Sequence, residues 1–313
     1  VIPSLDYPLF RLLQRRSFLE KNQLKAYLFA FLSVFLWSTV ASAFKLSLHY
    51  LNATQLLFYA SSVSLVLLFC VISYQKKWLL FKRYSIKIYW HLSLLGVINP
   101  FTYYLVLFHA YELLPAQEVQ PINYTWALML SYLSVMILKH QISVYDILAG
   151  FICYFGVFVI STHGELLSFS FTDLNGIGLA LFSTVLWSLY WIYTTKLNVD
   201  PLIGLFVNFL VGVPCIVGYM FMQNIAFIGD VYGMLGAFYV GLFEMGITFI
   251  LWLQAMRYST NTAKIANLIF LSPFLSLLFI AYFLKEEILP STFIGLILII
   301  AGLLVQQKER FRR

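Results

Sequence analysis

Ten stretches of mostly apolar residues follow one another along the chain and leave little sequence between them. A helix that crosses a membrane needs about 20 apolar residues. Strands of a membrane barrel would alternate apolar and polar residues, whereas these stretches are apolar on nearly all sides. The sequence therefore predicts an all-α integral membrane protein with ten transmembrane helices, over residues 26–48, 53–74, 88–111, 115–138, 144–161, 175–196, 201–223, 231–255, 262–284 and 291–307.

The composition excludes a soluble fold. Of the 313 residues, 61% are hydrophobic and 11% are charged, whereas soluble domains contain about 45–50% apolar and about 25% charged residues. Ten spans take up roughly 200 residues, which leaves no room for a catalytic domain in water. Cys70, Cys153 and Cys215 all fall inside apolar stretches, so we expect buried thiols and neither a metal site nor a cofactor.

Positive charge is distributed unevenly between the two sides of the predicted bundle. If the N-terminus is cytoplasmic, all of the 20 Lys and Arg residues except Lys45 and Lys285 fall in cytoplasmic segments. Cytoplasmic loops of membrane proteins carry such an excess. We therefore expect a multi-pass protein of the inner (cytoplasmic) membrane with both termini in the cytoplasm. The net charge of +7 then reflects topology and anionic lipid, and no nucleic acid is expected as a partner.

The residues before the first span are basic. The stretch from Pro8 to Lys21 places Leu and Phe among several Arg and Lys residues. Such a segment is either a short amphipathic helix on the membrane surface or a disordered basic tail. It lacks the order of charges, apolar stretch and cleavage site of a signal peptide.

The two halves of the chain resemble each other. Ser33, Leu36, Trp37 and Ser38 recur as Ser183, Leu186, Trp187 and Ser188, at a shift of 150 residues. Because each half holds five spans, an odd number, the second half inserts upside down, as in secondary transporters with a substrate site near the midplane. A duplication that serves only stability is the alternative. The predicted parts are a basic N-terminal segment, a first repeat, an outer loop, a second repeat and a basic tail, at 1–25, 26–161, 162–174, 175–307 and 308–313.

Several motifs resemble the drug/metabolite transporter superfamily, in its ten-span branch with two EamA-type domains. The similar stretches are Leu36-Trp37-Ser38, Leu186-Trp187-Ser188-Leu189-Tyr190, the run from Thr248 to Met256, Ser272-Pro273, Leu284-Lys285-Glu286 and Ile294-Gly295 through Gly302. The run from Ile122 to Trp126 is similar to the Asn-Tyr-Leu-Trp-Pro stretch of the aromatic amino acid exporter branch. Ala127 stands where that branch has Pro, and Lys139-His140 where many relatives have Gly-Glu. The resemblance covers residues 26–306 and implies an exporter of amino acids or similar amphiphiles.

The fourth predicted helix carries a polar stripe. Gln120, Asn123 and Tyr124 lie within about 100° of one another, together with Ser131 and Ser134. Such a stripe is costly in lipid and should face the interior. Asn123 can hold one end of a zwitterion, and the rings of Tyr124 and Trp126 can cover an apolar substrate. A hydrogen-bond network between helices without a ligand is the alternative.

The first and sixth helices carry matching polar positions, Ser38 in one and Ser188 with Trp191 in the other. Facing a common axis, they would line a cavity. Close helix packing through small residues explains them equally well. Trp252 and Asn267, in the eighth and ninth helices, complete the predicted substrate-binding residues.

Glu244 lies in the middle of an apolar run. A charged residue at the centre of a membrane helix costs about 2.5–3.5 kcal/mol. A carboxyl group that gains and loses a proton there can couple transport to a proton gradient, or it can bind a substrate amine. A permanently neutral acid bonded to a neighbouring helix is the structural alternative.

These features together predict a secondary transporter that exports small organic metabolites such as amino acids by alternating access, with possible proton coupling. No GxxxxGK[ST] phosphate loop is present, so ATP is not expected to drive it. A membrane-embedded enzyme, a receptor or a scaffold is the alternative, but HExxH and GxSxG motifs are absent, and no enzyme activity is expected. The expected partners are membrane lipid and a small-molecule substrate, and the protein is expected to be a monomer or a homodimer.

Overall fold

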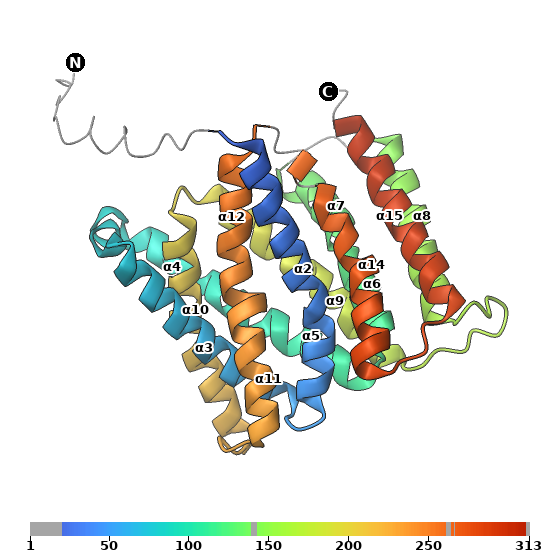
Figure 1. The fold of residues 1–313 in the computed structure, drawn as a ribbon, viewed down its shortest axis with the longest axis horizontal. Helices are drawn as coiled ribbons and strands as arrows, with labels where there is room; N and C mark the ends of the chain where they lie inside the picture. Colours follow the sequence, from blue (N-terminus) through green and yellow to red (C-terminus); the bar gives the residue numbers. More distant parts are fainter. Residues whose placement is uncertain (1–20, 139–142, 261–263, 266, 311–313) are drawn as a thin grey trace.

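The computed structural model describes residues 21–138, 143–260, 264–265 and 267–310, and over these ranges it is a bundle of helices (Figure 1). The first half contains α2 (Gln23–Leu48), α3 (Ala53–Tyr74), α4 (Ile86–Gly96), α5 (Tyr103–Leu113), α6 (Ala116–Tyr124), α7 (Trp126–Leu138) and α8 (Val144–Ser161). The second half contains α9 (Leu174–Lys196), α10 (Pro201–Met222), α11 (Val231–Leu242), α12 (Thr248–Tyr258), α14 (Ser272–Phe279) and α15 (Pro290–Arg310). The predicted N-terminal amphipathic segment up to residue 20, Lys139-His140 and the tail from residue 311 lie outside the described residues.

In the part of the chain that the structure describes, helical structure lies in all ten predicted stretches, but not all of these helices are long and apolar enough to cross a membrane. Within the described residues, eight helices are long and apolar enough to cross a membrane. The apolar part of α15, Pro290–Gln306, is shorter. The stretch 115–138 is divided into α6 and α7, because α6 ends at Tyr124 and Thr125 caps it. The protein is therefore a multi-pass membrane protein, while ten crossings remain a prediction.

Polar side chains fix where several helices begin. Asn52 and Gln55 form a capping box at the start of α3, which satisfies backbone N–H groups that have no partner inside the helix. Asp173, Asp200 and Asp230 each accept backbone hydrogen bonds at the first turns of α9, α10 and α11. An acceptor at this position stabilises a helix by about 0.5–2 kcal/mol. These three aspartates thus mark helix starts that the apolar pattern alone locates only approximately.

The third span of each half contains a π-helical segment at the corresponding place. These segments are η2 (Val97–Thr102), between α4 and α5, and η3 (Phe243–Ile247), between α11 and α12. Pro100 in η2 lacks a backbone N–H, which interrupts the hydrogen-bond ladder. Single π-helical turns inside α-helices often mark functional sites, and η3 contains Glu244.

Contacts between the two halves come in matching pairs. The helix α2 packs against α11, α12 and α14, and its counterpart α9 packs against α4, α5 and α7. The last helices of the halves, α8 and α15, pack along each other at one side of the bundle (Figure 1). Gly156 and Gly295 permit this approach, because a Cβ on Gly156 would lie 2.6 Å from the Gly295 carbonyl oxygen. Small residues allow membrane helices to approach closely.

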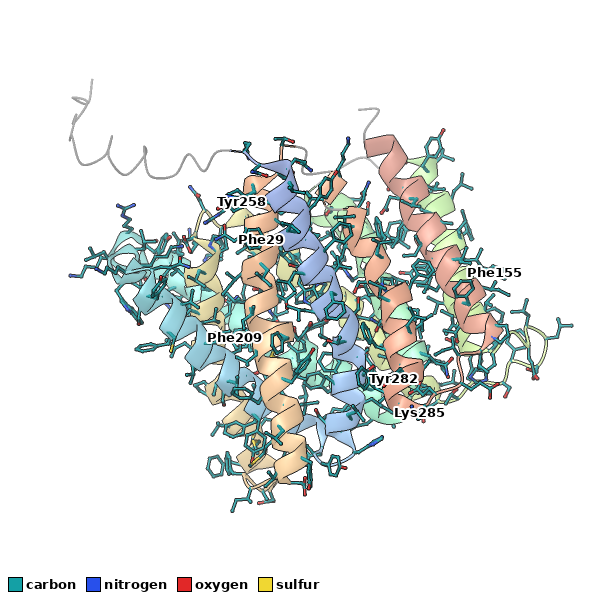
Figure 2. All side chains as sticks on the ribbon, in the orientation of Figure 1. Phe29, Phe155, Phe209, Tyr258, Tyr282 and Lys285 are labelled. Atoms are coloured by element: carbon teal, nitrogen blue, oxygen red, sulfur yellow. The ribbon has the colours of Figure 1, made fainter. Side chains whose placement is uncertain are left out.

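The helix α2 begins and α15 ends at the same end of the bundle (Figure 1). We call this the terminal end and the opposite one the far end. Phe29 and Tyr258 stack at the terminal end with ring centroids 5.7 Å apart, and Lys285 lies toward the far end (Figure 2). Large apolar side chains such as Phe155, which is 50% exposed, cover the outer surface of the bundle (Figure 2). An outer surface of this kind suits contact with lipid chains.

Candidate functional site

A cavity of about 410 Å³ lies inside the bundle. Its volume falls within the range of about 300–1,000 Å³ that small-molecule sites occupy. Both halves of the chain contribute to the wall, through α2, α5, α6, α7, α9, η3, α12 and η4 (Asn267–Leu271). The lining residues are Trp37, Val40, Ala41, Phe44, Tyr103, Leu107, Tyr111, Gln120, Asn123, Tyr124, Trp126, Ala127, Leu130, Trp187, Trp191, Glu244, Phe249, Trp252, Met256, Ile269 and Phe270.

The cavity differs in accessibility between its two ends. Four lining residues toward the far end are buried, namely Phe44, Leu107, Tyr111 and Gln120. Lining residues toward the terminal end are partly exposed, among them Leu130, Met256 and Ile269. The cavity is therefore sealed toward the far end and more accessible toward the terminal end.

Polar contacts hold the far end together. The Lys45 ammonium donates hydrogen bonds to the carbonyl oxygens of Tyr111 at 2.6 Å and Leu114 at 2.8 Å, at the end of α5. The Glu286 carboxylate, from the second half, accepts from the backbone N–H groups of Ala116 and Gln117 at the start of α6. A cation at a helix C-terminus and an anion at a helix N-terminus are both favourable. The Glu286 contacts link the two halves at this end of the cavity, and the Lys45 contacts link α2 to α5 within the first half.

Among the described residues that line the cavity, Glu244 is the only one with a charged side chain. One of its carboxylate oxygens, Oε1, accepts a hydrogen bond from the Tyr104 hydroxyl at 3.0 Å. The second oxygen accepts none from the residues that the structure describes. Because η3 interrupts the regular helix at this residue, the carboxyl group is presented to the cavity from the middle of the span Val231–Tyr258.

Five aromatic rings form a continuous wall beside Glu244. In the order of contact they are Trp252, Trp37, Phe249, Trp187 and Tyr103, and we call them the aromatic wall. Successive ring centroids lie 5.6, 5.6, 6.4 and 4.6 Å apart. All five rings line the cavity, so the wall presents ring faces and edges to any molecule inside it.

The break between α6 and α7 brings further polar groups to the cavity. Asn123 donates a hydrogen bond from its amide nitrogen to the Ser183 hydroxyl at 2.9 Å. The Gln120 side-chain oxygen and the Trp191 indole nitrogen are buried without a hydrogen-bond partner in the described structure. Both residues line the cavity, and a buried polar atom without a partner is costly unless a ligand or water satisfies it.

Seven of the predicted site residues line this cavity, and three do not. The seven are Gln120, Asn123, Tyr124, Trp126, Trp191, Glu244 and Trp252. Ser38 is fully buried and donates to Val34 and to Ser272 on α14, and Ser188 donates to the Trp126 carbonyl oxygen at 2.9 Å. Asn267 is exposed on η4. The two serines therefore lie between packed helices, the alternative that small residues in membrane helices allow.

The polar stripe predicted on the fourth helix also lies only partly in the cavity. Its first part, at Gln120, Asn123 and Tyr124, lines the cavity. In its second part, Ser131 donates to Asp146 on α8 and Ser134 donates to the Leu130 carbonyl oxygen. After the break at Thr125, α7 presents Trp126, Ala127 and Leu130 to the cavity, and its two serines point elsewhere.

Four residues of the aromatic wall, Trp37, Tyr103, Trp187 and Phe249, were not among the predicted site residues. One signal was present, since Trp37 and Trp187 stand next to the serines of the repeated Leu-Trp-Ser motif. In each helix the tryptophan, rather than the serine after it, lines the cavity. Tyr103 and Phe249 follow the π-helical segments η2 and η3, which apolar periodicity does not reveal.

The described residues contain no group of three or more His, Cys, Asp or Glu side chains that could hold a metal ion. The fold and the site define a multi-pass membrane protein with an internal cavity built by both halves of the chain. The EamA-like transporter family matches residues 24–162 and 174–306. The chain therefore belongs to this family of membrane transporters, within the drug/metabolite transporter superfamily, and contains two EamA-type repeats.

A solved crystal structure supports the fold. It is 19% identical to this chain, the match covers 92% of this chain and 98% of that one, and the TM-score is 0.62. At this identity the likeness concerns the fold alone. No curated protein matches the chain. The predicted membership of the superfamily is confirmed, and the similarity to the aromatic amino acid exporter branch remains a prediction.

Proposed function

We propose that the protein is a secondary transporter that exports small organic metabolites, such as amino acids and related amines, across the inner membrane. The observation that carries the proposal is the cavity of about 410 Å³ between two EamA-type repeats. Its one acidic side chain, Glu244, and its aromatic wall suit a molecule with a polar end and an apolar body. Sites between repeats are typical of secondary transporters.

The cavity, sealed at the far end and accessible from the terminal end, would be one state of an alternating-access cycle. We propose that the repeats are inverted relative to each other, which the matching contacts of α2 and α9 support. With both termini in the cytoplasm, the sealed far end faces outward, and the cavity receives substrate from the cytoplasm. Opening the far end requires the contacts of Lys45 and Glu286 to part. The π-helical segments η2 and η3 offer places for the third and eighth spans to bend.

Glu244 would supply the coupling to protons. A carboxyl group inside a membrane bundle is costly to ionise without a partner, so proton uptake and substrate binding compete for it. Proton entry from outside would then accompany each molecule exported. The Tyr104 hydroxyl donates a hydrogen bond to the carboxyl group and positions it in this structure.

Purified protein reconstituted into liposomes tests the proposal. Amino acids and amines loaded inside should leave faster when the protein is present, and efflux should saturate and show counterflow. A saturable exchange separates a carrier from a channel, because a channel has no obligatory conformational cycle. Equal efflux from empty and protein-containing vesicles, across a broad panel of metabolites, would reject the proposal.

The orientation has a separate test. Single cysteines near Lys82 and Asp173 in a cysteine-free background should react with impermeant reagents from opposite sides of the membrane. Lys82 lies in η1 (Lys77–Arg83) and Asp173 caps α9. Labelling of both from the same side would contradict five spans in the first half.

A further inference from the structure

We infer that the cavity selects small organic cations, namely amines with an aromatic or apolar body, over amino acids and organic acids. The ammonium group would bind between the Glu244 carboxyl group and the aromatic wall. This inference rests on the proposed function in taking the cavity as the substrate site.

The charge of the lining favours a cation. Among the described residues that line the cavity, Glu244 has the one charged side chain and none is Lys, Arg or His. One carboxylate oxygen accepts a hydrogen bond from Tyr104, and the other accepts none from the part of the chain that the structure describes. An ammonium group supplies both the missing donors and the missing opposite charge. Buried charges are stable when they are paired and hydrogen-bonded.

The walls of the cavity favour a cation as well. The negative face of an aromatic ring attracts a cation within about 6 Å of its centroid. The aromatic wall includes three tryptophans, the ring type that binds cations best. Tyr103, the last ring of the wall, packs at 4.7 Å against Tyr104, which holds the Glu244 carboxyl group. The wall therefore reaches the carboxyl group through one ring contact.

An additional acceptor lies in the lining, but no cationic partner for an anion does. The Gln120 side-chain oxygen is buried without a partner in the described structure and is available to accept a hydrogen bond from a substrate N–H group. A substrate carboxylate would find neutral N–H donors, such as the Trp191 indole, but no cation among the described lining residues. It would also be repelled by an ionised Glu244. For a zwitterion, the unfavourable free energy of placing its carboxylate in the cavity offsets part of the favourable free energy of binding its amine.

Three indole compounds of similar shape isolate this effect. Tryptamine carries the amine alone, tryptophan carries amine and carboxylate, and indole-3-acetate carries the carboxylate alone. Isothermal titration of the purified full-length protein in detergent, with empty micelles as the blank, gives the three affinities. We expect tryptamine to bind at least about tenfold more tightly than tryptophan, and indole-3-acetate not to bind measurably.

Variants assign the preference to the cavity. Glu244→Gln should remove the preference for tryptamine, Trp37→Ala should weaken tryptamine binding, and Glu165→Gln, in the exposed outer loop, should change neither. If the Glu244→Gln variant does not fold, the Glu244→Asp variant and the selectivity of the unmodified protein test the inference instead. Equal affinity for tryptamine and tryptophan, or a preference for indole-3-acetate, would overturn the inference. If tryptamine is bound preferentially but not transported, the inference about selectivity stands and the proposed function is overturned. If metabolites are transported without a preference for amines, the proposed function stands and the inference is overturned.

Discussion

Trp37 and Trp187 occupy the same position in the two repeats, 150 residues apart, and both contact the ring of Phe249. Trp37 lies 5.6 Å and Trp187 lies 6.4 Å from it, centroid to centroid. Each tryptophan also contacts an aromatic residue of the other repeat that follows the π-helical segment in that repeat's third span. This residue is Phe249 for Trp37 and Tyr103 for Trp187. The duplicated sequence has thus produced one shared aromatic wall.

Removing either of these tryptophans should weaken substrate binding while the bundle still folds. A cation over an aromatic ring gains about 0.5–2 kcal/mol, so Trp37→Ala and Trp187→Ala should each raise the KM for an amine by about 2- to 30-fold. Initial rates of uptake into liposomes measure this. Trp90→Ala, on the outer surface where Trp90 is 67% exposed, is the matched control. An unchanged KM in both cavity variants would contradict a role of the wall in binding.

Glu244→Gln should remove the effect of a proton gradient on transport. The amide keeps the size of the side chain and can still accept from Tyr104, but it does not take up a proton in the working pH range. Efflux by the original protein should accelerate when the outside is acidified, and efflux by the variant should not. Tyr104→Phe removes only the hydrogen bond and should keep the gradient effect. If the variant responds to pH as the original does, Glu244 is not the coupling residue.

Lys45→Met should make the far end open more readily. The change removes the hydrogen bonds to Tyr111 and Leu114 and retains most of the side-chain volume. Losing about 1 kcal/mol of the contacts that seal this end would shift the equilibrium toward the outward-open state about fivefold. Labelling of a cavity cysteine by an impermeant reagent added outside should speed up accordingly. Slower labelling, or an unchanged rate, would show that Lys45 does not seal the cavity.

Gly156→Ala should destabilise the contact between α8 and α15. The new Cβ would lie 2.6 Å from the Gly295 carbonyl oxygen and 3.0 Å from Leu298, and overpacking of this kind costs about 1–3 kcal/mol. The midpoint of thermal unfolding in detergent should fall. Gly218→Ala on α10 is the control, because nothing lies within 4 Å of its added Cβ. Equal midpoints for the two variants would mean that the helices can separate freely.

The sequence predicted the helices better than the cavity. Runs of apolar residues indicate a membrane helix in any protein, because lipid imposes the same requirement on each one. The helix break at Thr125 and the π-helical segments η2 and η3 leave no periodic signal, although Pro100 lies within η2. The serines of the repeated motif were predicted to face the cavity, but Ser38 donates to Ser272 instead. Glu244 was recognisable from sequence because a charge inside an apolar run has few structural explanations.

Access to the cavity from both sides of the membrane is the most direct test. Ala127 lines the cavity, and Ala127→Cys in a background without Cys70, Cys153 and Cys215 gives one reporter. In membrane vesicles of known orientation, an impermeant thiol reagent should modify it from the cytoplasmic side and, during turnover with substrate and a proton gradient, also from the outside. Substrate without a gradient should protect it. Modification from one side only, under every condition, would contradict alternating access through this cavity.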